Sequence, residues 1–190
     1  FGLRSHGVML QSIGGGGGAV FGGNLGGLAL RSGGTGNGGA ISFAQTGNIL
    51  VDGEGSRGVI AQSLGGGGGY VEGLFAGSAG GTGNGAAINL LLGGAVMATA
   101  LDATAVFAQS SGDAGGNIAV TVSGDVRGGS GTGAGIVLDG GANNHILSSK
   151  SLSAVSQLAA SGSTGNDTLE NAGRLFGNVL LGGGNNRLLN

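Results

Sequence analysis

The chain has 190 residues, of which 51 are Gly and none is Pro, Cys or Trp, and its formal net charge is -2. Its few Arg and Lys residues are scattered, which argues against a nucleic-acid-binding patch or a polybasic membrane-binding run. The absence of Cys excludes disulfides and thiolate metal sites. A Gly content this high often indicates disorder, but an apolar fraction of 39% and a repeated placement of the glycines favour a folded chain.

A short apolar lead-in recurs along the chain and ends in Gln-Ser. It reads "VMLQS" at 8–12, "VIAQS" at 59–63 and "VFAQS" at 106–110, and a divergent copy, "IVLDG", places Asp139 at the Gln position. Stacked side-chain amides can hydrogen-bond along a pile of identical strands. The repeat therefore predicts two structural ladders, formed by Gln11, Gln62 and Gln109 and by Ser12, Ser63 and Ser110.

Each repeat contains three short segments that predict strands. The first alternates apolar and polar residues, as in "AISFAQ" at 40–45, and the second covers 48–51, 95–98 and 125–127. The third is the lead-in itself. Gly, Asn, Asp and Ser separate the segments, which is typical of strands joined by turns. We expect ten side chains to face the core: Ile41, Phe43, Val59, Ala61, Ile88, Leu90, Val106, Ala108, Val120 and Val122.

The last part of the chain has a different repeat. "GGANNHIL" at 140–147 matches "GGGNNRLL" at 182–189, and brief strands are predicted at 168–171, 174–177 and 178–181. We therefore expect one domain over 1–190, with long Gly-rich repeats over 1–139 and shorter coils with Asn/Gly turns over 140–190. The expected fold is all-β, a β-solenoid (parallel β-helix) of Gly-rich coils with about three short strands each.

Two runs of five glycines, 14–18 and 65–69, follow the first two lead-ins. Gly permits a close approach between backbones and a positive φ, but it also loses the most conformational entropy on folding. The runs are either closely packed or form a surface excursion, and the sequence leaves both interpretations open.

Residues that could carry chemistry are few. "GSTGNDTLE" at 162–170 resembles a Ca²⁺-binding nonapeptide, which makes Asp167 a weak calcium candidate, although tandem copies are required. Asp52 and Glu54 are two positions apart in a predicted turn, and His6 and His145 have no acid-base partner nearby in the sequence. We therefore expect no enzymatic activity, no cofactor and no established metal site.

The segment 86–108 is nearly uncharged and long enough to cross a bilayer. Asn89 and Asp102 interrupt it, however, and it aligns with a plainly polar segment of the preceding repeat. We therefore expect no transmembrane segment in this chain.

The lead-ins with their glycine runs, "GVMLQSIGGGGG" and "GVIAQSLGGGGG", resemble the "AQSIGGGGG" repeats in passenger regions of bacterial autotransporters. "GNDTLENAGRLFGNVLLGGGNNRLLN" resembles the terminal coils of the same group. The resemblance implies a secreted β-helical stalk on a Gram-negative surface, with a structural, adhesive or matrix role and possible contact with a host surface. It leaves as an alternative a passenger module that binds glycans or Ca²⁺.

The two ends of the sequence show no capping helix, Pro or run of charges. Open ends of repeat proteins expose apolar surface and unpaired amides, which recruit other chains. We therefore expect chains to associate end to end as a homopolymer.

Overall fold

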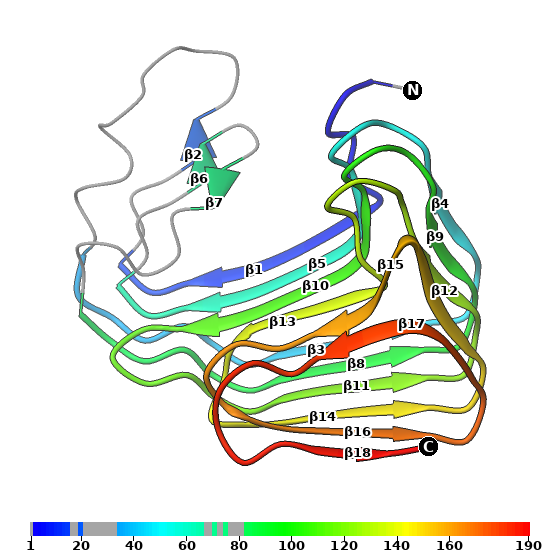
Figure 1. Ribbon diagram of the computed structural model, residues 1–190. Coiled ribbons are helices and arrows are strands. Elements are labelled where there is room, and N and C mark those ends of the chain that lie inside the picture. Colours follow the sequence, from blue (N-terminus) through cyan, green and yellow to red (C-terminus); the bar gives the residue numbers. More distant parts are fainter. Residues whose placement is uncertain (1, 16–18, 21–33, 67–69, 72–73, 76–81) are drawn as a thin grey trace.

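The computed structural model describes residues 2–15, 19–20, 34–66, 70–71, 74–75 and 82–190. These residues form strands, turns and irregular segments, with no helix among them, so the all-β prediction is confirmed for this part of the chain. Most strands lie in three rows, and within each row neighbouring strands pair in parallel (Figure 1).

Strands one repeat apart in the sequence are neighbours in each row. The first row consists of β3 (Ile41–Gln45), β8 (Ile88–Leu92), β11 (Ile118–Val122), β14 (Asn143–Ser148), β16 (Asn166–Asn171) and β18 (Arg187–Leu189). The second row begins with β4 (Ile49–Val51), β9 (Val96–Ala98) and β12 (Val126–Gly128). The third begins with β1 (Val8–Ile13), β5 (Arg57–Leu64), β10 (Thr104–Ser111) and β13 (Ile136–Gly140).

Two long strands, β15 (Ser151–Ser161) and β17 (Arg174–Leu180), extend through both the second and the third rows. The start of β15 pairs with β12, and its end pairs with β13. The separate strands predicted at 174–177 and 178–181 are therefore one strand. Gly177 is the last residue of the first predicted strand, has a φ of 104° and lies where the register of β17 against β15 shifts. A positive φ of this kind suits Gly and lets the chain bend at the corner while it remains in the sheet.

The chain passes through the rows in the same order each time, and we call one passage a circuit. Five circuits can be followed in the described residues: β3–β4–β5, β8–β9–β10, β11–β12–β13, β14–β15 and β16–β17. Val59 pairs with Val106, which pairs in turn with Ile136, so circuits of different length keep a common register. The difference in length therefore falls in the segments that connect one strand to the next in the sequence.

A small separate sheet is formed by β2 (Ala19–Val20), β6 (Tyr70–Val71) and β7 (Leu74–Phe75). β2 pairs with β6 in parallel, whereas β6 and β7 are antiparallel. These strands belong to the segments that follow β1 and β5 in the chain, away from the three rows (Figure 1).

The core lies between the three rows. Nine of the ten side chains expected to face it are buried, and Phe43 is partly buried against the same cluster. Burying one Ile or Leu contributes about 1.5–3 kcal/mol, so the columns of Ile, Leu and Val supply the main driving force for folding. Ile60 and Phe107, on the opposite side of β5 and β10, are also buried, which the sequence did not predict.

The apolar segment 86–108 contributes β8, β9 and the start of β10. Among the described residues, no helix has the length and apolar character needed to cross a membrane.

Candidate functional site

The predicted glutamines form a continuous column on the outer side of the third row. Gln11, Gln62 and Gln109 are register partners on neighbouring strands. Gln11 Nε2 donates to Gln62 Oε1 at 2.6 Å, Gln62 Nε2 to Gln109 Oε1 at 2.7 Å, and Gln109 Nε2 to Asp139 Oδ2 at 2.7 Å. Gln62 is fully buried. Because each amide is donor and acceptor at once, its hydrogen bonds satisfy polar atoms that burial would otherwise leave unpaired.

The serines that follow the glutamines are also register partners, but their hydroxyls bond to the backbone of the segments that lead into the first row. Ser12 Oγ accepts from the Gly39 amide at 2.7 Å. Ser63 Oγ donates to the Gly39 carbonyl at 2.9 Å and accepts from the Ala86 amide at 2.8 Å. Ser110 Oγ donates to the Ala86 carbonyl at 2.9 Å. The serines are thus stacked beside the glutamines, and their hydroxyls connect the third row to the first row across a corner.

The first two glycines of each run have separate structural roles. A Cβ on Gly14 or Gly65 would overlap the backbone of the segment that returns toward the first row. Gly15 and Gly66 adopt φ values of 59° and 57°, which other residues rarely take. The start of each run is therefore packed closely, whereas residues 16–18 and 67–69 lie outside the described residues.

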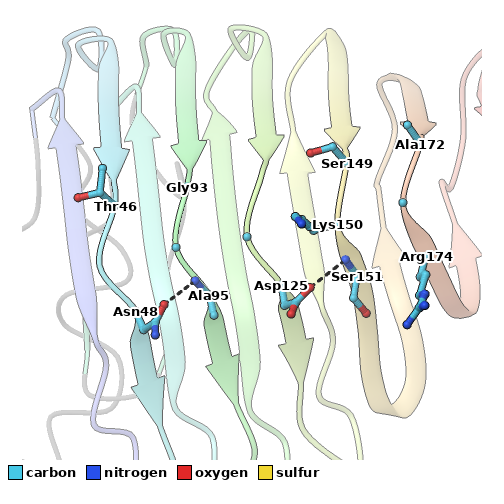
Figure 2. A pocket seen from close by; sticks show the side chains of 13 residues that line it. Thr46, Asn48, Gly93, Ala95, Asp125, Ser149, Lys150, Ser151, Ala172 and Arg174 are labelled. Atoms are coloured by element: carbon cyan, nitrogen blue, oxygen red, sulfur yellow. Dashed lines mark hydrogen bonds between the residues drawn. The ribbon is translucent and has the colours of Figure 1, made fainter.

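Polar side chains also connect circuits at the corner between the first and second rows. Asn48 Oδ1 accepts from the Ala95 amide at 3.0 Å, and Asp125 Oδ1 accepts from the Ser151 amide at 3.1 Å (Figure 2). In each case a side chain of one circuit caps a backbone amide of the next. The corner is therefore held by hydrogen bonds that run from circuit to circuit.

A groove of about 970 Å³ follows this corner across all five circuits. Its floor is poor in side chains, because Gly93, Gly94, Gly124 and Gly173 contribute to it, and Figure 2 shows one turn after another along its length. Lys150 and Arg174 supply positive charge on consecutive circuits, and Asp125 supplies one carboxylate. The lining comes from Thr46 and Asn48 and from 93–95, 124–125, 149–151 and 172–174.

The calcium candidate Asp167 lies in the interior of a second column, on the first row. It is 1% exposed, and its Oδ1 accepts from Asn144 Nδ2 at 2.7 Å. Its Oδ2 has no partner with good hydrogen-bond geometry. Burial raises the pKa of this carboxyl, although interactions with the Asn144 side chain and the Ser163 backbone amide oppose that effect. Asn186 stands at the position that corresponds to Asp167 in the later segment 182–189, and its Oδ1 accepts from the Asp167 amide at 2.8 Å. Asn186 and one oxygen of Asp167 are thus already engaged within the protein.

This second column was not recognised in the sequence. Asn144 accepts from the Ile118 amide at 3.0 Å and donates both to the Gly140 carbonyl at 3.0 Å and to Asp167. Asn144 and Asp167 are register partners on β14 and β16. The only signal for the column in the sequence is the pair of residues, Asn-Asn or Asn-Asp, that opens each strand.

In the structure each histidine has an interaction partner that is distant from it in the sequence. His145 Nε2 lies 3.7 Å from Glu170 Oε1 on the outer side of the first row. His6 Nδ1 accepts from the Arg57 amide at 3.1 Å, and burial, together with the charge of Arg57, lowers the pKa of His6.

The two carboxylates considered for catalysis, Asp52 and Glu54, are both exposed in the turn between β4 and β5. Glu54 lines a hollow together with Arg4 and Asp102. Asp52 is not part of the lining of that hollow. The structure therefore does not place Asp52 and Glu54 together around a common cavity.

Within the described residues, no group of three or more His, Asp or Glu side chains could hold a metal ion. No protein-family model, curated protein or solved structure matches the chain. These comparisons therefore add no support for a function.

Proposed function

We propose that the chain is a β-solenoid and that it serves as a rigid structural shaft outside a bacterial cell, in a surface protein or filament with an adhesive or matrix role. The observation that carries this proposal is the continuous parallel pairing of the first row, whose register does not shift. The first row keeps parallel partners from β3 to β18 across six strands.

Three sets of interactions oppose bending between circuits. The core columns fill the interior, the glutamine column joins four strands of the third row, and the corner side chains cap amides of the next circuit. Each circuit contacts its neighbours most, as in other repeat proteins, so length can be increased by adding circuits. The extracellular bacterial setting is supported by the resemblance of the glycine-run repeats to autotransporter passengers.

A test of the shaft is to lengthen it. Residues 106–135 form one circuit, because Val106 pairs with Ile136. Insertion of one, two or three further copies after Gly135 should lengthen the stack of circuits by about 4.8 Å for each copy, or about 14 Å for three, as measured by electron microscopy.

An insert of the same length and composition in scrambled order serves as the control and should not lengthen the particle in equal steps. If the copies leave the length of the stack unchanged, or unfold the chain, the proposal of an extendable shaft is wrong.

A further inference from the structure

The groove at the corner continues onto the outer side of the second row. In a strand, residues two positions apart point to the same side of the sheet. The residues two positions after those that line the groove at the start of each second-row strand are therefore on the outer side as well. They are register partners from circuit to circuit: Leu50, Met97, Arg127, Ser153 and Phe176. A second hollow of about 340 Å³ is lined by Arg127 and Phe176 and shares Asp125 and Ser151 with the groove. The two hollows therefore form one trough, which we call the corner trough.

Positive charge is concentrated in the corner trough. The chain has seven Lys and Arg residues and a net charge of -2, yet three of its cations, Arg127, Lys150 and Arg174, line the trough. Asp125 is the one carboxylate in the lining, and its Oδ1 already accepts from Ser151. None of the three cations forms an ion pair within the described part of the chain. The trough thus favours an anionic ligand.

The shape of the trough favours a chain of sugars over a peptide. Its floor of glycines lets a ring approach the backbone, and Thr46, Ser149 and Ser151 offer hydroxyls that can bond to those of a sugar. Phe176 is 56% exposed and lies two residues beyond Arg174, so its ring can pack against the apolar face of a sugar.

The spacing of the circuits supports the same ligand. Neighbouring strands are about 4.8 Å apart, close to the length of one sugar unit in an extended oligosaccharide, whereas a peptide advances about 3.3 Å per residue. Lys150 and Arg174 lie on consecutive circuits, so they can meet acidic groups on consecutive sugars. We propose that the corner trough binds an extended acidic oligosaccharide that carries carboxylates on successive units.

In this arrangement Lys150 and Arg174 bind two neighbouring carboxylates, and Arg127 and Phe176 hold a sugar at the second-row side of the trough. Asp125 accepts hydrogen bonds from sugar hydroxyls and disfavours a carboxylate at its own position. The binding of an oligosaccharide is a function additional to the proposed structural role. It does not depend on that role, because any chain that contains these five circuits would contain the trough.

The test is a calorimetric titration of the whole 190-residue chain with hexagalacturonate, an acidic oligosaccharide. Maltohexaose, a neutral oligosaccharide of equal length, and hexaglutamate, an acidic peptide, are titrated in parallel. We expect hexagalacturonate to bind with at least about tenfold higher affinity than either control.

The Lys150→Ala/Arg174→Ala double variant should weaken hexagalacturonate binding at least about tenfold, and Phe176→Ala should weaken it severalfold. Arg187→Ala, which removes an exposed cation from the first row, is the matched control and should leave the affinity unchanged. Circular dichroism of each variant checks that the fold is retained.

Absence of hexagalacturonate binding to the native chain would overturn the proposal. Equal binding of hexaglutamate would also overturn it, because the trough would then recognise charge without selecting a sugar. A loss of affinity in Arg187→Ala equal to that of the double variant would place binding elsewhere on the surface and would overturn it as well.

Discussion

Two columns of stacked polar side chains run along the molecule, and they differ in where a carboxylate is placed. In the glutamine column, each amide donates to the next, and the last acceptor is Asp139, which is only partly buried. In the asparagine column, Asp167 lies in the interior, 1% exposed, and one of its oxygens has no partner. An amide passes a hydrogen bond onward, whereas a carboxylate only accepts. A carboxylate is therefore well placed at an accepting end that solvent reaches, as at Asp139, and poorly placed at one that is buried, as at Asp167.

The largest effect should follow from placing a carboxylate inside the glutamine column. Gln62→Glu removes the donor to Gln109 Oε1 and buries a charge that faces another acceptor. We expect a loss of about 4 kcal/mol in the free energy of unfolding at pH 7, with part of it regained near pH 4, where the new carboxyl can be protonated and can donate. Urea unfolding at the two pH values measures both effects, and a variant as stable as the native chain at pH 7 would contradict this view of the column.

Removal of the central amide of the asparagine column should have the next largest effect. Asn144→Ala deletes the acceptor for the Ile118 amide and the side-chain donor to Asp167, which leaves buried polar groups unpaired. We expect a loss of about 3 kcal/mol by urea unfolding. Asn143→Ala, at the exposed neighbouring position, is the matched control and should lose less than about 1 kcal/mol. Equal losses in the two variants would mean that burial in the column is not what matters.

A smaller effect, of opposite sign, should follow from correction of the misplaced carboxylate. Burial raises the pKa of Asp167 in the folded chain, so its contribution to stability is fully present below the unfolded-state pKa of about 4 and is lost as the pH rises through the folded-state value. Asp167→Asn should remove this loss and stabilise the chain by about 1 kcal/mol at pH 7.

The measurement is the free energy of unfolding as a function of pH for the native chain and for Asp167→Asn. Asp52→Asn, at an exposed turn, is the control and should keep the pH dependence of the native chain. A destabilised Asp167→Asn variant at pH 7 would show that the buried carboxylate has a partner that favours its charged form.

The smallest effect is expected at the end of the glutamine column. Asp139→Asn keeps an oxygen that can accept from Gln109 Nε2, so the free energy of unfolding should change by less than about 0.5 kcal/mol. If Asp139→Asn lowered the free energy of unfolding as much as Gln62→Glu, the cost of a substitution would not depend on its position in the glutamine column. That result would contradict the account of the two columns given above.

The sequence revealed the glutamine column because identical residues occupy equal places in repeats that are easy to align. The asparagine column was hidden for a physical reason: the matching segments 140–147 and 182–189 are two circuits apart, and the strand between them has diverged. Asp167 belongs to that intervening strand, and its local pattern therefore suggested a calcium loop. Only the pairing of β14 with β16 makes Asp167 the register partner of Asn144.

The corner trough was hidden for a related reason. It is built from five turns, such as 46–48 and 172–174, and none of them is a recognisable motif alone. Four of the five share a central Gly, but their other residues differ. The proximity of His145 and Glu170 was likewise invisible, because strand pairing creates it. Repeats therefore predict which residues share a column, but they do not predict what the turns form together.

The central claim is that successive circuits stack at a constant spacing, and spin-label distances test it most directly. The chain has no Cys, so pairs of introduced cysteines can be labelled cleanly. Ser42, Ala119, Thr168 and Arg187 belong to one column of register partners along the first row, so pairs of Ser42→Cys with Ala119→Cys, Thr168→Cys or Arg187→Cys lie two, four and five strands apart. Stacked circuits predict backbone separations of about 10, 19 and 24 Å, and the label distances should rise in proportion. Distances that fail to increase in this order, or that give the same broad distribution for all three pairs, would contradict the account.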